Sequence, residues 1–558
     1  MVSPITAREI LASYDSITIE KEILNNIFMF LLLGKRFLLI CPDSNVLKSK
    51  SSIYLFNDEG LDIPHIMLKE EEITECGDIP KGKYRYVCLY EQESFVNSIF
   101  TFKEKIIDVI DRLVKLLSMD KKTCEKEFQK EFLYYWNSNS SKYLGEVYLK
   151  QDQSFSKVEF YSSKHQNRLI EIGLELSDIN DREKGKKKWI HHIENDVFII
   201  PIIDNRGILP PHRGCSWTAK NVQDIIYGNQ INHVSDETYA SIKSFRPATQ
   251  NVILIFIMKL ESSSISFAVK LKCKNVTNRT LLEKVCEDLI DLELMKTTRK
   301  DYMYLNNQIG NDIGLQGKKV LLVGAGTLGS YVASELVKNG VSELTIYDED
   351  ILSPDNTMRW FYSGLGKGGN KATVIGLLLK WIHPQISVKA VPQNINQETL
   401  KEEVDQVDMI IFTIGNSDSQ LYFNHILKII NCKIPVIFTW LEAGGKYSHV
   451  LHVNYSQKGC YQCLFTTEKG ELTNNRANIN SEIILENNIL RNGCGGTRAA
   501  YGTSVILRTV AALLDVIQKM LSNNICENTI IDIMPDKVAT SEKIFPMKGC
   551  ECCDVIVK

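Results

Sequence analysis

The stretch that decides the fold opens with KKVLLVGAGTLGS at residues 318–330 and continues to the acidic run ELTIYDED at 343–350. The pattern predicts a buried strand, a tight turn into a helix, and then a second strand. Three glycines mark the turn: Gly324, Gly326 and Gly329. They let the backbone approach a phosphate at a helix N-terminus, and Asp348 is placed where an acid grips a ribose hydroxyl. By itself the pattern favours an NAD-dependent oxidoreductase.

The segment SPDNTMRWFYSGLGKGGNKA at 353–372 changes this interpretation. It adds Asn356, Arg359 and Lys371 just past the acidic strand, where a hydride-transfer site has no need of them. Arg and Lys neutralise phosphate charge as an acyl group attacks an α-phosphate, and the amide can orient them. The segment therefore favours a site that cleaves a nucleoside triphosphate.

The ordered combination GxGxxG, D-x-D, N-x-x-R and G-x-x-K resembles the ThiF/MoeB/ubiquitin-activating-enzyme superfamily over residues 296–558. The resemblance implies a Rossmann-like domain that uses ATP and Mg²⁺ to adenylate the C-terminal carboxylate of a small β-grasp protein. It also implies that Asp348 holds the ribose and that Asn356, Arg359 and Lys371 handle the triphosphate. Relatives of this kind usually pair through the nucleotide domain, so the resemblance implies a homodimer.

Two positions depart from the family pattern. The family usually has an Asp in a T-D-N run after the next strand, whereas this chain has Ile414, Gly415 and Asn416. Asp418 is our candidate for the role of that acid, through a shifted loop. An upstream arginine of the family is replaced by Asn307.

Composition bounds the remaining possibilities. A chain of 558 residues suggests about three domains, and its net charge of −3 argues against broad affinity for nucleic acid or a membrane surface. The longest apolar runs are too short to span a bilayer, and the N-terminus shows no signal-peptide pattern. We therefore expect a cytoplasmic protein, in which the 15 cysteines serve as thiols, metal ligands or nucleophiles rather than as disulfides.

Residues 1–120 predict an α+β unit. We expect helical segments at residues 6–14 and 20–26, and a longer helix at 102–118, whose apolar residues fall on one face. The expected strands are RFLLIC, SSIYLF and IPHIML, and the run KYRYVCLYEQESF follows them. Cys88, in V-C-L-Y before the long helix, resembles the nucleophile of ubiquitin-conjugating enzymes, although the family's H-P-N triplet is missing and His65 is a poor substitute. The alternative is a buried cysteine that acts as a small apolar residue.

Residues 121–295 predict an α/β connector. The run EKEFQKEFLYYW indicates an amphipathic helix, DVFIIPII, NVILIFIM and SISFAVKLKC indicate strands, and the charged run at 182–189 indicates a solvated loop. Cys215 lies beside His212 and Arg213, which favour a thiolate. We nevertheless favour a structural loop there.

Two cysteine pairs near the C-terminus predict a structural zinc site. They are Cys460 with Cys463 and Cys550 with Cys553. Two C-x-x-C knuckles supply the four thiolates of a closed tetrahedral Zn²⁺ site, and Cys552 is an alternative to Cys553. ThiF-like enzymes commonly carry such knuckles.

Cys494 lies among glycines, near Arg498, in a polar crossover segment before a long apolar helix. The thioester-forming members of the superfamily carry their acceptor cysteine in this crossover, so the resemblance makes Cys494 the transfer cysteine. The alternatives are a structural cysteine, or a loop that closes over ATP in an enzyme that only adenylates.

Together these resemblances imply an acyl relay from AMP to Cys494, then to Cys88, then to an amine on a target. The order of domains resembles the fusions of conjugating and activating domains in CBASS-type antiphage operons. That resemblance implies a substrate which is a ubiquitin-like protein or the operon's nucleotide cyclase. The alternatives are a sulfur-carrier adenylyltransferase with an N-terminal binding module, an NAD-dependent oxidoreductase, or a degenerate scaffold.

Overall fold

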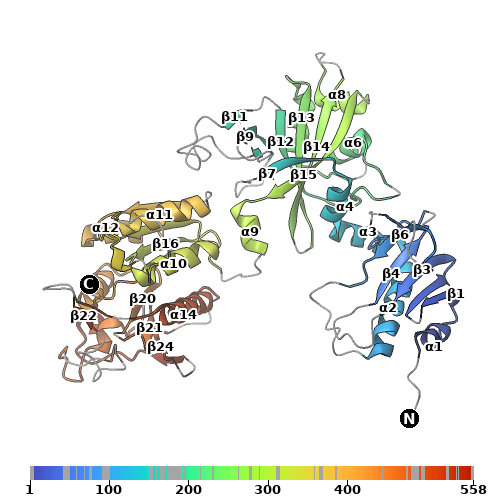
Figure 1. The fold of residues 1–558 in the computed structure, drawn as a ribbon. Coiled ribbons are helices and arrows are strands. Elements are labelled where there is room, and N and C mark those ends of the chain that lie inside the picture. The colour runs from blue at the N-terminus through green and yellow to red at the C-terminus, as the bar shows by residue number, and fades with distance from the viewer. Residues whose placement is uncertain are drawn as a thin grey trace, which may run out of the picture. The chain divides into compact units, whose positions relative to one another are not determined.

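The structure is a computed structural model in which the chain forms two compact units that meet in sequence between Arg299 and Lys300. It describes residues 6–554 apart from 25, 42–50, 58–59, 68–69, 74–77, 91–100, 148, 150–154, 159, 164–169, 173–189, 193–195, 214, 229–230, 262, 275–278, 288, 309–313, 357, 363–367, 384–385, 443, 473–475, 479–488, 492–496, 500, 523–526, 536 and 538. Each of the three regions expected from the sequence contains one large sheet (Figure 1). No helix in the described part combines the length and the apolar character needed to cross a bilayer.

The N-terminal sheet is antiparallel, with strand order β1-β2-β3-β4-β6-β5. Its strands are β1 Ile17–Leu24, β2 Ile27–Leu32, β3 Lys35–Ile40, β4 Ser52–Phe56, β5 Glu71–Ile73 and β6 Gly82–Val87. Leu33 and Gly34 both have positive φ, which is the geometry of a two-residue hairpin that joins β2 to β3. Helices α1 (Ala7–Ala12) and α2 (Phe102–Leu117) share one core with this sheet, and a capping box of Thr101 and Glu104 starts α2.

Two N-terminal expectations were wrong. Residues 20–24 of the expected helix at 20–26 lie instead in β1, which pairs antiparallel with β2 and buries Ile17 and Ile23. Sheet pairing there overrides the helix preference of Glu and Lys. The run IPHIML is not a strand, since it turns at His65 (φ +66°) and makes only the isolated bridge between Ile66 and Val87 in its described part.

The middle sheet has the strand order β11-β9-β10-β7-β15-β14-β13-β12-β8. Its strands are β7 Lys142–Val147, β8 Ser156–Val158, β9 Phe160–Ser163, β10 Ile170–Ile172, β11 Ile190–His192, β12 Asp196–Ile202, β13 Asn251–Lys259, β14 Ser264–Cys273 and β15 Ile290–Arg299. Its helices are α3 Lys121–Lys130, α4 Phe132–Asn139, α6 Ala219–Tyr227, α7 Asp236–Ser244 and α8 Leu281–Cys286. The three strands expected here are confirmed, whereas the expected single helix breaks at Glu131 into α3 and α4. The charged run at 182–189 lies outside the described residues.

The C-terminal sheet follows the order β18-β17-β16-β19-β20-β21-β24-β25. Its strands are β16 Lys319–Val323, β17 Glu343–Tyr347, β18 Ser387–Val391, β19 Met409–Phe412, β20 Val436–Leu441, β21 Ser448–Val453, β24 Thr529–Ile533 and β25 Thr540–Lys543. The first five strands in this order are parallel and the last three are antiparallel. The remaining elements are α9 Tyr302–Gln308, α10 Thr327–Lys338, α11 Lys371–Ile382, α12 Gln397–Val404, α13 Ser417–Ile429, α14 Thr503–Leu521, α15 Glu551–Asp554 and the small sheet of β22 Ile489–Arg491 and β23 Thr497–Ala499.

Alternate residues of β16 enter two different cores, which places helices on both faces of the sheet. Val320 and Leu322 belong to the core that includes α10, α11 and α14, and Leu321 and Val323 belong to the core that includes α12 and α13. In a parallel sheet that is covered on both faces, the strand sequences are continuous apolar runs, such as VLLV in β16. The strand order reverses between β16 and β19, and ligands of open α/β sheets bind at such a switch point.

Candidate active site

The glycine turn after β16 has the geometry expected from the sequence. Gly324 has φ +101°, which favours glycine, and a Cβ on Gly329 would lie 2.0 Å from the carbonyl oxygen of Gly324. Gly326 is the N-cap of α10, and a Cβ there would meet nothing within 4 Å. The turn thus leaves open space at a helix N-terminus, where backbone N–H groups favour an anion.

Asp348 follows β17 and faces this turn. Its carboxylate accepts hydrogen bonds from the backbone N–H groups of Ala325 at 2.6 Å and Asp350 at 2.8 Å. Burial raises the pKa of Asp348, and the Ala325 N–H and the charge of Lys371 oppose that rise. The acid is therefore held against the glycine turn, at the carboxyl end of a parallel strand.

Lys371 begins α11 and its side chain is only 12% exposed. Its Nζ lies 2.7 Å from Asp350 Oδ2, and its backbone N–H donates to the carbonyl of Asp350. The preceding residue, Asn370, caps α11 and donates from Nδ2 to the carbonyl of Asp348 at 2.7 Å. These contacts bind the start of α11 to the acidic strand end, so the D-x-D run and the lysine form one unit.

Arg359 reaches the site from the segment after the short helix η2 (Pro354–Asn356). Its backbone N–H donates to the carbonyl of Asn356, and the Asn356 amide oxygen accepts from Ser353. The guanidinium lies 4.9 Å from the ring centre of Tyr501, within the range of a cation–π contact. The segment's fold is thus set locally, whereas the arginine also contacts a residue from the end of the crossover.

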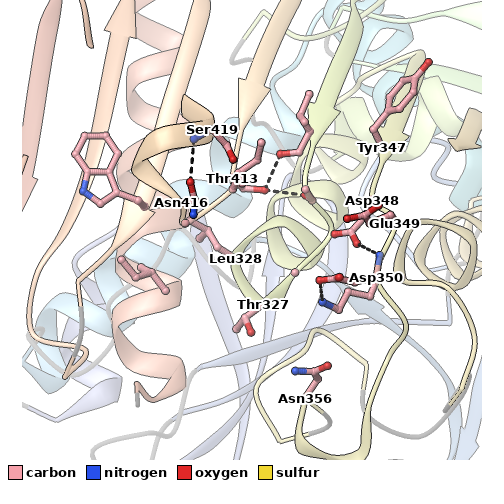
Figure 2. Close-up of a pocket in the computed structure, with 18 of the residues that line it drawn as sticks. Thr327, Leu328, Tyr347, Asp348, Glu349, Asp350, Asn356, Thr413, Asn416 and Ser419 are labelled. Carbon is pink, nitrogen blue, oxygen red and sulfur yellow. Dashed lines mark hydrogen bonds and ion pairs between the residues drawn. The ribbon is translucent and has the colours of Figure 1, made fainter. Parts of the chain in front are cut away.

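These residues line a cavity of about 540 Å³ (Figure 2). Six of the residues that line it were predicted from the sequence as site residues: Gly324, Gly326, Asp348, Asn356, Arg359 and Lys371. Figure 2 shows Asp348 and Asp350 at one side of the pocket and Asn416 and Ser419 at the other. Two cationic side chains, three carboxylates (Glu349 is the third) and a helix N-terminus converge there. Such a set can bind a polyphosphate together with a divalent cation.

Two candidate positions lie elsewhere. Gly329 is not a lining residue and instead packs under the turn, close to Thr413. Asp418 is exposed in the first turn of α13 and is not among the lining residues. Two residues stand where the chain departs from the family pattern. Asn416 lines the pocket and accepts from Ser419 N–H as the cap of α13, whereas Asn307, on α9, accepts from Gln316 Nε2.

The pocket also contains residues that the sequence analysis did not assign. Thr413 Oγ1 donates to the carbonyl of Gly324 at 2.7 Å, and Asp350 pairs with Lys371. The sequence could have indicated Asp350, because it is the second acid of the D-x-D run. Trp440 and Tyr501 line the pocket from distant parts of the chain and had no local signal.

The two cysteine pairs form one buried cluster. The four Sγ atoms lie within 4.8 Å of one another, and four of their separations are 3.9, 3.7, 3.4 and 3.7 Å. Tetrahedral Zn–S bonds of about 2.3 Å place neighbouring sulfurs roughly 3.8 Å apart. The cluster is therefore of the right size to hold a metal ion. Its members are Cys460, Cys463, Cys550 and Cys553.

The structure also separates Cys552 from Cys553. Cys553 Sγ lies 3.4 Å from Cys463 Sγ and accepts from Gly459 N–H, as metal-bound thiolates do. Cys552 is fully buried, and its Sγ lies 2.9 Å from Gln462 Oε1. Cys552 is thus not a member of the four-sulfur cluster.

Cys88 comes directly after β6 and is half-buried. Its backbone N–H donates to the carbonyl of His65 at 2.7 Å. The His65 ring lies 3.0 Å from Glu131 and 3.5 Å from Glu127, and the hydrogen bond to Glu131 is the main cause of the raised pKa of His65. The turn beside Cys88 is therefore held by side chains of α3 and of the α3–α4 junction.

The other two thiol hypotheses have different outcomes. Burial raises the pKa of Cys215, and its backbone pairs with His212 in both directions, as expected of the structural loop that we favoured. Cys494 lies outside the described residues, so its role stays a prediction.

Comparison with known proteins identifies the domain around the pocket. Residues 311–543 match the ThiF family, so the chain contains a ThiF-family domain. A Pseudomonas aeruginosa protein described as ATP-dependent ubiquitin transferase-like protein Cap2 is 24% identical over 307 residues, which is 53% of this chain and 55% of that protein. A protein of the same description from Enterobacter hormaechei is 34% identical over 120 residues, 21% of this chain and 19% of that one.

The Escherichia coli sulfur carrier protein ThiS adenylyltransferase is 28% identical over 174 residues, covering 30% of this chain and 68% of that protein. Among solved structures, E. coli MccB with ATP has 22% identity and a TM-score of 0.34, and the match covers 43% of this chain and 67% of that one. This chain spans about half the length of the Pseudomonas relative that it matches.

Proposed function

We propose that the chain uses ATP and Mg²⁺ to adenylate the C-terminal carboxylate of a partner protein. One observation carries this proposal: Asp348, Arg359 and Lys371 converge on one pocket at the switch point of a ThiF-family domain. The partner's carboxylate oxygen attacks the α-phosphorus of ATP, the bond to the bridging oxygen breaks, and pyrophosphate leaves with its electron pair. Arg359 and Lys371 stabilise the charge that develops on the phosphates, and Asp348 binds the ribose.

Mg²⁺ would neutralise phosphate charge, and the donors in this pocket suit it. Mg²⁺ prefers one or two carboxylates together with phosphate oxygens and water. Glu349 and Asp350 line the pocket and are closer candidates than Asp418, which is exposed on α13. We therefore propose that Glu349 and Asp350 bind Mg²⁺ in place of the family Asp, whose position is occupied by Gly415 in this chain.

We propose further that the acyl group moves from AMP to Cys494, then by thioester exchange to Cys88, and that an amine takes it from Cys88. Each thiolate attacks the acyl carbon and expels AMP, or the previous thiolate, so atoms and charge balance at each step. In this proposal residues 1–120 form a conjugating-enzyme-like domain, and the fusion raises the effective concentration of one cysteine at the other. The similarity to ubiquitin transferase-like relatives supports it. The fused order of domains further suggests a role in antiphage defence.

Exchange of labelled pyrophosphate into ATP tests the adenylation. The full chain is incubated with ATP, Mg²⁺ and a candidate partner encoded beside it, with the partner's C-terminal carboxylate free. Exchange that requires all three components supports the proposal. Reduction of NAD without exchange would instead favour an oxidoreductase. The similarity to ThiS adenylyltransferase favours a second candidate, an enzyme that adenylates without a thioester relay.

We propose that the four-cysteine cluster holds zinc as a structural site. We expect about one tightly bound zinc per chain by mass spectrometry, and its loss in Cys460→Ser/Cys463→Ser together with much of the C-terminal domain's thermal stability. Cys552→Ser should keep the metal because Cys553 supplies the fourth sulfur. Cys286→Ser, at an exposed thiol on α8, is the control. A metal-free wild type of full stability contradicts the assignment.

We also propose that the chain is a homodimer, because relatives of this kind usually pair through the nucleotide domain. Light scattering of the purified chain should give twice the monomer mass of 63.5 kDa. A strictly monomeric protein that is active in exchange contradicts this proposal.

A further inference from the structure

His449, on β21, lies fully buried between two carboxylates. Its Nδ1 is 2.7 Å from Asp532 Oδ1 on β24, and its Nε2 is 2.7 Å from Glu442 Oε1, directly after β20. The Trp440 ring stacks on the imidazole with ring centres 4.8 Å apart. Three neighbouring strands of the sheet therefore meet at this histidine, behind the pocket that Trp440 lines.

The two contacts favour a protonated, positively charged histidine. A neutral imidazole has a single N–H, so one of the carboxylates would face a nitrogen lone pair at hydrogen-bond distance. An imidazolium donates to both. Burial by itself lowers the pKa of His449, but the hydrogen bonds and charges of Asp532 and Glu442 outweigh burial and raise it. Among the described residues these two are the charged groups in contact with the ring, and Thr439 Oγ1 donates only to the His449 carbonyl.

Glu442 begins the turn between β20 and β21, and this turn packs against Tyr501. The carbonyl of Glu442 accepts from Gly445 N–H at 3.2 Å, and its N–H donates to the carbonyl of Tyr447. Gly445 has φ +65°, and a Cβ there would lie 2.7 Å from Tyr501 Cβ. The backbone of the turn is thus in direct contact with Tyr501.

Tyr501 in turn contacts the phosphate-handling arginine, since the Arg359 guanidinium lies 4.9 Å from its ring centre. A continuous set of contacts therefore leads from the buried ion triad through Glu442, Gly445 and Tyr501 to Arg359. A movement of the Glu442 turn changes the surface on which the guanidinium lies.

We propose that His449 is a positioning residue of the nucleotide site: held between Asp532 and Glu442, it fixes the turn that places Tyr501 and, through Tyr501, Arg359. The inference rests on the proposed function only in taking ATP as the ligand. It gives a structural role to the buried triad of His449, Asp532 and Glu442, which takes no part in the adenylation steps. Burying an ion pair is costly unless all its groups are paired, so the triad is stable only as a complete set.

The test measures Mg²⁺–ATP binding by calorimetry on the full chain. His449→Gln keeps a planar hydrogen-bonding side chain but removes the charge, and we expect it to weaken ATP binding about tenfold. His452→Gln is the matched control. His452 is also buried on β21, but burial lowers its pKa, so its loss removes no cation. The control should bind ATP as the wild type does.

A double-mutant cycle separates positioning from general stability. If His449 acts through Arg359, His449→Gln should have little further effect in an Arg359→Ala chain, because the group that it positions is gone. Equal losses in both backgrounds would overturn the proposal. Should His449→Gln fail to fold, ATP binding by Asp532→Asn is compared in the wild-type and Arg359→Ala backgrounds, and the two outcomes have the same meaning.

A pH series supplies a second readout. A histidine whose pKa is raised in the fold exerts its effect below that pKa and loses it as the pH rises, so wild-type ATP affinity should fall at high pH. Asp532→Asn removes a charge that raises the pKa, so the fall should shift to lower pH. Wild-type binding that is unchanged by pH and by His449→Gln overturns the inference alone. A wild type that binds no ATP at any pH overturns the nucleotide site as well.

Discussion

Arg359→Ala and Lys371→Ala are each expected to reduce ATP–pyrophosphate exchange about a hundredfold or more, as expected for removal of a group that stabilises developing phosphate charge. Both side chains line the same pocket, and Lys371 is held at its edge by Asp350. The loss should fall mainly on the rate of exchange rather than on the apparent affinity for the partner protein, because neither residue needs to contact the partner.

The matched control is Lys380→Ala, which removes an exposed lysine from the same helix as Lys371 and should leave exchange unchanged. Lys371→Arg tests geometry, because it keeps the charge on a side chain of different shape. Wild-type exchange in both alanine variants would show that the adenylation site is elsewhere.

Cys494→Ala and Cys88→Ala are expected to stop the relay at different steps. Cys494→Ala should still adenylate the partner, because the phosphate chemistry belongs to residues 324–371, but it should form no thioester. Cys88→Ala should accumulate partner on Cys494 as a band sensitive to reducing agent and form no amide product. Only the thiolate at each position can accept the acyl group, whereas the preceding step is complete without it. Non-reducing gels of the loaded chain report both steps.

Cys215→Ala is the control for the relay, since its thiol is part of a paired loop and burial raises its pKa. It should leave every step intact. Full product from Cys88→Ala would mean that the N-terminal unit is a binding module, as in the adenylyltransferase alternative. If Cys494→Ala is fully active too, no relay through these cysteines exists.

In the N-terminal region the sequence predicted some elements correctly and others wrongly. The helix at 102–118 and the strands of RFLLIC and SSIYLF were predictable, because each has an apolar period that a single element can bury. The helix expected at 20–26 was wrong because the charged residues there favour a helix in isolation, whereas residues 20–24 form part of β1, which pairs with β2. Its conformation depends on a neighbour rather than on its own residues.

The sequence by itself determined the glycine turn, the acid at Asp348 and three of the cluster cysteines, Cys460, Cys463 and Cys550. Each depends on a short-range requirement: a positive φ at Gly324, a strand end that presents a carboxylate, or a C-x-x-C spacing that brings two sulfurs together. Only the tertiary structure decided that Cys553 rather than Cys552 completes the cluster, that Tyr501 lies under Arg359, and that His449 lies between two acids. These features join residues far apart in the chain. Which side chains meet is set there by strand order and packing, which no local pattern encodes.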